Sequence, residues 1–343
     1  MTAEAADATS ERAAKVHQEA IVFDAVNRAV IDDGFFRDVR NGNISVLGRT
    51  ILVSDPAVFS PFGFQESLRL VAELHELAAQ HADKMLIVRG IDDIELAKST
   101  GRVGIYVYFQ SPEPLARYPW RLTLFYELGL RILQMTYNER ELTGDGCFEK
   151  NDGGLSIYGR ALIKHCNELG IAVDASHCGD RTTLETIEES AAPVLLTHGN
   201  SRMICPKPRC KTDEAVKACA ARGGVIGVQA FPPFMNDGSH PPTIEDVLDH
   251  VDHYAELVGS EHIGLGLDLV TGHENDDFKL LRYDPNMYKG AWVGGVQQTV
   301  AGLSTLGEMP RLTEALIARG YSDKDITGIL GGNYIRVLHE IWK

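Results

Sequence analysis

Two histidines, His177 and His198, are the residues in this sequence whose positions most directly predict chemistry. Each follows a short apolar run, IAVDAS or PVLLT, of the kind that forms a buried strand. If those strands are neighbours in a parallel sheet, two imidazoles at their carboxyl ends can share one metal ion. Each imidazole could instead bond to the backbone or to a neighbouring acid, and this interpretation stays open beside metal binding.

An acid and an arginine could complete such a site. Asp268 ends the apolar run IGLGL, where a carboxylate could act as a general base, a metal ligand or an orienting group. A helix cap or a buried ion pair is the alternative for Asp268. Arg209, in the loop CPKPRC, has the planar guanidinium that binds a carboxylate through two hydrogen bonds, although a solvated loop arginine is the plainer interpretation.

Other suggestive residues point less clearly to chemistry. His250 and His253 lie three residues apart in an apparent helix without a third ligand, so packing or surface roles are favoured. Cys178 would need a base oriented towards its thiol, which the adjacent His177 is badly placed to supply. The loop aromatics Phe231, Phe234, Tyr288 and Trp292 could line a pocket, but such side chains pack structurally at least as often.

The elements that must position this site are eight short apolar runs, most of them followed by an amphipathic helix. They span residues 20–26, 84–89, 102–110, 130–137, 171–177, 193–198, 223–231 and 262–268. This alternation predicts a parallel sheet, and eight units predict a closed (β/α)₈ TIM barrel, with a doubly wound sheet as the rival. The active site of such a barrel lies at the carboxyl ends of its strands. We expect one domain over residues 1–343, with an N-terminal extension at about 1–18 and a loop-rich insertion at about 28–66.

Composition limits the classes of partner. The 343 residues carry a formal net charge of −15, which disfavours nucleic acid and anionic membranes because both require basic surface. No run of 18 apolar residues predicts a membrane span, and the N-terminus lacks the apolar core of a secretory signal. The six cysteines form no CxxC pair and are expected to be reduced thiols, which favours a cytoplasmic protein.

Several segments together resemble a known family. They are DASHCGDRTTLETIEESAAPVLLTHGNSR, AARGGVIGV, DHVDHYAELVGSEHIGLGLD and GGNYIRVL, which occur in order from about Leu122 to the C-terminus. In this order and spacing they resemble the membrane (renal) dipeptidases, peptidase family M19, while the first third resembles them more weakly. The resemblance implies a (β/α)₈ barrel that hydrolyses dipeptides with two zinc ions bridged by hydroxide.

The resemblance also implies roles for individual residues. The family's zinc-binding histidines after strands five and six correspond to His177 and His198. Its substrate-carboxylate arginine, eleven residues beyond the second histidine, corresponds to Arg209. Its aspartate after strand eight, proposed to handle protons, corresponds to Asp268.

Three of the family's five metal-ligand positions, and one further histidine position, are altered in this chain. The family's His-x-Asp pair after strand one is replaced by Val26-Asn27-Arg28, its bridging Glu by Gln110, and its histidine after strand four by Tyr137. A site with two metal ions would therefore lack three of its five ligands. Arg28 would place a positive charge near the missing zinc, where it could replace that cation electrostatically or bind a substrate carboxylate.

These observations predict a hydrolase of a small amide, dipeptide or related carboxylate-bearing molecule, with one zinc ion. The residues expected to act are Asp268 and Tyr137 in catalysis, Arg209, Arg28 and Asn138 in substrate binding, and His177, His198 and Gln110 in metal binding. Two alternatives stay open: a metal-free acid–base enzyme such as a lyase or isomerase, and a non-catalytic protein that binds a small ligand. A homodimer is an open alternative for the oligomeric state.

Overall fold

The computed structural model describes residues 3–51, 63–270, 292–293, 296–297 and 299–343, and side chains from residue 10 onward outside 292–297. The sequence-based pocket candidate Tyr288 and the side chain of Trp292 lie outside this part of the chain.

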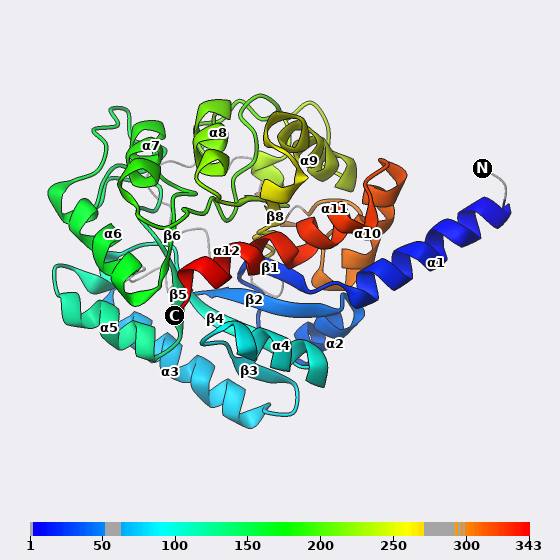
Figure 1. Ribbon diagram of the computed structural model, residues 1–343, viewed down its shortest axis with the longest axis horizontal. Coiled ribbons are helices and arrows are strands. Elements are labelled where there is room, and N and C mark those ends of the chain that lie inside the picture. Colours follow the sequence, from blue (N-terminus) through cyan, green and yellow to red (C-terminus); the bar gives the residue numbers. More distant parts are fainter. Residues whose placement is uncertain (1–2, 52–62, 271–291, 294–295, 298) are drawn as a thin grey trace.

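A ring of parallel strands forms the centre of the molecule (Figure 1). Neighbouring strands pair in the order β1–β2–β4–β5–β6, and β7 pairs with β8. Single parallel bridges close the ring: Asp174 with Leu195, Leu196 with Ile226, and Asn27 with Leu269. The eight barrel strands, here called staves, are therefore β1, β2, β4, β5, β6, the stretch around Leu195, β7 and β8. The closed (β/α)₈ barrel is confirmed. The strands are β1 (Val22–Asn27), β2 (Ile44–Thr50), β3 (Met85–Ile87), β4 (Val103–Phe109), β5 (Leu130–Gln134), β6 (Ala172–Asp174), β7 (Ile226–Val228), β8 (Ile263–Leu265), β9 (Trp292–Val293) and β10 (Val296–Gln297).

Helices surround the strands, as the apolar stripe of each predicts. They are α1 (Ala3–Glu19), α2 (Asp33–Asn41), α3 (Phe64–Gln80), α4 (Ile91–Thr100), α5 (Pro119–Glu127), α6 (Ile157–Leu169), α7 (Asp180–Glu189), α8 (Asp213–Ala221), α9 (Ile244–Val258), α10 (Met309–Ala318), α11 (Asp323–Thr327) and α12 (Asn333–Ile341). None of the helices in the described ranges is long and apolar enough to cross a membrane.

Helix α12 closes the amino-terminal end of the barrel, and its Tyr334 is buried among inward-facing strand residues. The Tyr334 hydroxyl donates to the Thr197 carbonyl at 3.1 Å. Glycine is required at two facing positions, because a Cβ on Gly227 would lie 2.5 Å from the Tyr334 hydroxyl and one on Gly264 would lie 2.4 Å from its ring. Because α12 closes the amino-terminal end of the barrel, an active site can lie only at the carboxyl ends of the strands.

Two sequence-based assignments need correction. The stretch 28–66, predicted to be a loop-rich insertion, contains α2 and the true second stave β2. Residues 84–89, predicted to be that stave, form only the short β3, which pairs with the start of β4. The count of eight staves was right, but one of its members was wrong.

The predicted N-terminal extension is a packed helix. Ala13 and Val16 of α1 are buried in the core. The His17 imidazole bridges Thr313 Oγ1 at 2.8 Å and the Gly42 carbonyl at 2.9 Å. Helix α1 therefore belongs to the outer layer of the barrel.

Candidate active site

The two histidines meet at the carboxyl end of the barrel. His177 follows β6, His198 follows the sixth stave, and their Nε2 atoms are 2.8 Å apart. Both side chains are buried, with 4% and 0% of their surface exposed. The structure thus brings together the pair that the sequence singled out.

The outer nitrogen of each ring is held by a polar neighbour. His177 Nδ1 lies 2.7 Å from Asn138 Oδ1, and His198 Nδ1 lies 2.8 Å from Thr197 Oγ1. Thr197 Oγ1 also lies 2.9 Å from Asp174 Oδ2, and a carboxylate only accepts hydrogen bonds. Because a hydroxyl has one proton, Thr197 donates it to Asp174 and accepts from His198.

This network determines which nitrogens carry protons. Both Nδ1 atoms donate, so both Nε2 atoms present lone pairs to one another across 2.8 Å. Burial, followed by the charge of Arg209, holds the pKa of His177 and that of His198 well below their usual range, so both rings are neutral. Two facing lone pairs repel unless a cation lies close to both.

Gln110 and Tyr137 border the histidine pair. The Gln110 amide nitrogen lies 3.1 Å from His198 Nε2, at the end of the third stave β4. The Tyr137 ring stacks on the His177 ring, with centroids 4.4 Å apart and planes 19° from parallel. Asn138, expected from the sequence to bind substrate, contacts the outer nitrogen of His177, a position from which it can orient that ring.

Asp268 lies where the last stave closes onto the first. Its backbone amide donates to the Val26 carbonyl at 3.0 Å, and its φ of 53° is in the left-handed region that side chains rarely adopt. The buried Asp24 carboxylate accepts from the neighbouring Leu267 amide at 2.7 Å. Burial raises the pKa of Asp268 to about 6, although Arg28 and Arg209 oppose the shift.

Two guanidinium groups, those of Arg28 and Arg49, lie near the carboxyl ends of the first two staves. Arg28 follows β1 and is 6% exposed, and Arg49 stands opposite Asn27 in the β1–β2 pairing. Arg49 donates to the Ala29 carbonyl, and burial together with the charge of Arg28 lowers the pKa of Arg49 to about 10. Sequence reasoning missed Arg49 because its strand was assigned to a loop; the β-type run ISVLGRT was the available signal.

Arg209 joins the backbone on either side of the histidine pair. Its two terminal nitrogens donate to the carbonyls of Ser176 and His198, each at 2.8 Å. The guanidinium is 1% exposed, and its Nε has no hydrogen-bond partner among the described residues. Arg209 therefore orders the ends of two staves and keeps one buried donor unsatisfied.

Gln229, after β7, is a further polar residue that follows a stave. Its side chain is fully buried, and neither its amide nitrogen nor its amide oxygen has a partner in the described part of the chain. Side chains alternate along a strand, so Gln229 faces the same way as Gly227, whose Cβ would meet the interior atoms of Thr197 and Tyr334. A buried polar group without a partner is costly and is normally satisfied by a ligand or water.

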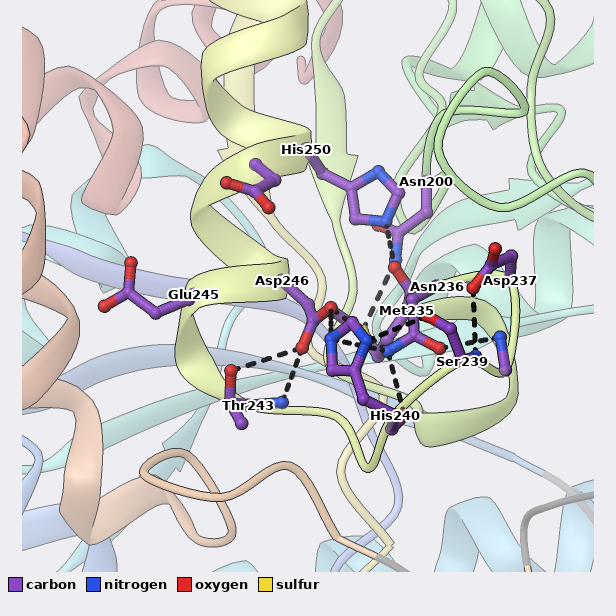
Figure 2. A network of polar contacts seen from close by, with 12 residues as sticks. Asn200, Met235, Asn236, Asp237, Ser239, His240, Thr243, Glu245, Asp246 and His250 are labelled. Carbon is purple, nitrogen blue, oxygen red and sulfur yellow. Dashed lines mark hydrogen bonds and ion pairs between the residues drawn. The ribbon is translucent and has the colours of Figure 1, made fainter.

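The remaining histidine and cysteine candidates have structural roles. Figure 2 shows His250 reaching from α9 towards Met235, whose carbonyl lies 2.8 Å from His250 Nε2, while Nδ1 accepts from the Ser201 amide. His253 pairs with Asp213 at 2.9 Å. Burial raises the pKa of the Cys178 thiol to about 12, which rules out a ready nucleophile. All six cysteines are buried free thiols, as predicted.

The donor atoms fit one metal ion and not two. Neutral imidazoles anchored through Nδ1 are the usual zinc ligands, and His177 and His198 both meet this description. At the position of a second ion the chain has Val26 and Arg28, neither of which binds a cation. Within the described ranges no group of three or more His, Cys, Asp or Glu side chains could hold a metal. One ion would therefore rely on the two histidines, with Gln110 or water completing its coordination.

Solved structures resemble this fold closely. An amidohydrolase from Pseudomonas aeruginosa is 34% identical, with a TM-score of 0.88 over 96% of this chain and 99% of that one. A metallo peptidase from Rhodobacter sphaeroides, solved with a phosphinate mimic of the dipeptide L-Ala-D-Ala, is 20% identical, with a TM-score of 0.78 over 94% and 100% of the two chains. At 20% identity, the likeness to the metallo peptidase shows that the two proteins share a fold.

Sequence relatives agree with the structural ones. The dipeptidase verJ of Clonostachys rogersoniana is 27% identical over 282 residues, which is 80% of this chain and 66% of that relative. The chain thus spans just under two thirds of that relative's length. The family model for membrane dipeptidase (peptidase family M19) matches residues 4–278 and 290–343. The chain belongs to this family, the membrane dipeptidases of peptidase family M19.

Proposed function

We propose that this protein hydrolyses an amide bond in a small carboxylate-bearing molecule such as a dipeptide, using one bound metal ion. The observation that carries the proposal is the pair of imidazole nitrogens facing each other across 2.8 Å, at the same end of the barrel as the half-buried Asp268 carboxylate. The two imidazoles suit a cation, and Asp268 would supply the base. The buried free thiols favour a reducing compartment, and we place the protein in the cytoplasm.

His177 and His198 would hold the metal, with Gln110 as a weaker neighbour. When bound, such an ion lowers the pKa of water and polarises a carbonyl. Asn138 fixes the His177 ring through Nδ1, and the Tyr137 ring packs against its face. These two contacts fix the orientation of the His177 ring, so that its Nε2 faces His198 Nε2.

Asp268 accepts the proton of the attacking water in this proposal. A carboxyl group with a pKa of about 6 is ionised at neutral pH and yet basic enough to take up a proton. Arg28 and Arg209 favour its ionised form. After the carbon–nitrogen bond breaks, the same proton can pass from Asp268 to the leaving amine.

Cationic and amide groups at the carboxyl end of the barrel would recognise the substrate. Arg28, Arg49 and Arg209 provide the positive charge that an anionic end requires. Gln229 offers a donor and an acceptor together, which matches the carbonyl and N–H of a peptide bond. Tyr137 is the candidate donor to the oxygen that gains charge during attack.

The pH dependence follows from the raised pKa of Asp268. The base works when ionised, so kcat/KM should fall about tenfold per pH unit below pH 6 and level off above it. Asp24 and Glu141 also have raised pKa values, of about 7 and about 8. The pH profile of the Asp268→Asn variant distinguishes Asp268 from these two groups. If Asp268 is the base, the residual kcat/KM of this variant should no longer fall below pH 6. A fall that persists in the variant would assign the pKa of about 6 to another group.

The arginines should determine the preference for a free carboxylate. Replacing Arg28 with Gln is expected to raise KM for a dipeptide by about 10- to 100-fold, the effect of losing one charge-assisted contact of about 1.5–3 kcal/mol. The same change should barely affect a dipeptide amide, which lacks the charge. Arg37→Gln, on exposed α2 surface, is the matched control. An equal rise in KM for the dipeptide and for the dipeptide amide would show that Arg28 does not bind the substrate carboxylate.

A further inference from the structure

A cavity lies at the opposite end of the barrel from the histidines. It has a volume of about 400 Å³ and is lined by residues at the amino-terminal ends of β2, β3 and β4, together with α2 and α4. Figure 1 shows α2, α4 and β3 gathered beside β2. We call it the basal cavity, defined by Arg40, Asn43, Lys84, Lys98 and Arg102.

Positive charge is concentrated in the basal cavity. Arg40, Lys84, Lys98 and Arg102 line it, and Asp83 is the one carboxylate among its lining residues. The chain as a whole has 48 acidic against 33 Lys and Arg residues. The cavity lining, with four basic residues and one acidic residue, therefore has the opposite charge balance to the whole chain.

Three of these cations form no ion pair with a carboxylate of the described residues, namely Arg40, Lys98 and Arg102. The fourth, Lys84, lies 3.9 Å from Asp33, whose side chain is fully exposed. Because no described carboxylate neutralises these three cations, the electrostatic potential inside the cavity is positive.

Neutral groups hold two of the cations in place. Lys98 Nζ donates to the carbonyls of Gln18 at 2.8 Å and Ala20 at 2.7 Å. Arg102 donates from Nε to Thr100 Oγ1 at 2.9 Å and from a terminal nitrogen to the Ala82 carbonyl at 3.3 Å. These contacts order the side chains without neutralising them. Burial lowers the pKa of Lys98, the shift expected of a cation that lacks an acidic neighbour.

The rim of the cavity is also conformationally fixed. Asn43 has a φ of 49°, which is rare for a residue other than glycine. Its amide nitrogen donates to the His17 carbonyl at 2.8 Å, which ties the turn to α1. The cavity wall is thus built from anchored residues and not from a free loop end.

We propose that the basal cavity binds a small phosphate-bearing molecule. Guanidinium groups pair with phosphate through two parallel hydrogen bonds, and lysines add point charge, so this set suits a multiply charged anion better than a single carboxylate. The net charge of −15 repels extended nucleic acid, and the volume suits a metabolite. This site is distinct from the proposed hydrolytic one and does not depend on it.

Calorimetric titration of the full chain with pyrophosphate, at constant ionic strength, tests the proposal. We expect saturable binding of one pyrophosphate per chain, weakened at least tenfold in Arg40→Gln and in Arg102→Gln. Arg37→Gln, on the same helix but outside the lining, should bind as the unmodified protein does. Unchanged dipeptide hydrolysis and melting temperature in Arg40→Gln and Arg102→Gln would show that folding is intact.

Three results would overturn anion binding in the basal cavity, and a fourth would overturn the class of ligand. The first is no saturable binding of pyrophosphate to the unmodified chain. The second is unweakened binding in a folded Arg40→Gln, Arg102→Gln double variant. The third is loss of binding in Arg28→Gln, which would place the anion among the active-site arginines. Tighter binding of a single-stranded oligonucleotide than of pyrophosphate would overturn the small-molecule class.

Discussion

Replacing Asp268 with Asn is expected to lower kcat by about 10²- to 10⁴-fold, the usual contribution of a general base. The amide keeps the shape of the carboxylate but cannot accept a proton from water at neutral pH. Asn is also the least disruptive replacement, because it tolerates the left-handed backbone at a φ of 53°. Steady-state hydrolysis of a dipeptide measures the effect.

Metal content distinguishes the two roles that remain for Asp268. If it acts as a base, the Asp268→Asn protein should carry as much metal as the unmodified protein. A loss of metal in parallel with activity would make Asp268 a ligand instead. Full activity in a folded Asp268→Asn protein would contradict both roles.

Replacing His198 with Ala is expected to abolish metal binding and to lower kcat by about 10³-fold or more, since the ion supplies several kcal/mol of transition-state stabilisation. His177 alone would then lack the second strong ligand, and a single imidazole does not retain zinc against dilution. Elemental analysis and kinetics on the same preparation test the expectation.

His253→Gln provides the matched control, because His253 lies on α9 and pairs with Asp213 away from the staves. It should retain both metal and activity. Stoichiometric metal in folded His198→Ala protein would refute the ligand assignment. His177→Ala should behave as His198→Ala does, and a large difference between them would show that the ion does not lie between the two rings.

Much of the fold could be predicted because the strands and helices alternate with distinct periodicities. The stave that was missed, β2, directly follows the Gly- and Asn-rich residues 41–43 and contains Gly48, which weakens a strand signal. Gly48 is required there, since a Cβ would lie 2.0 Å from the Ala25 carbonyl. The run 84–89 was mistaken for a stave because apolar character alone does not show which strand pairs along its full length.

The positions of three candidate site residues could be predicted for a related reason. His177, His198 and Asp268 each follow a stave, and the closed ring brings stave ends together. The orienting role of Asn138 could not be predicted, because its contact with His177 spans 39 positions of sequence. The unsatisfied amide of Gln229 is equally invisible in sequence, since only the packing shows that none of the described residues bonds to it.

The measurement that tests the central claim most directly is elemental analysis of the unmodified protein, purified without chelator and assayed before and after metal removal. We predict one zinc ion per chain, loss of hydrolysis when it is removed, and recovery when zinc is restored. Two ions per chain would contradict the altered metal site. Full activity without metal would contradict the hydrolytic mechanism and favour acid–base chemistry by the same residues.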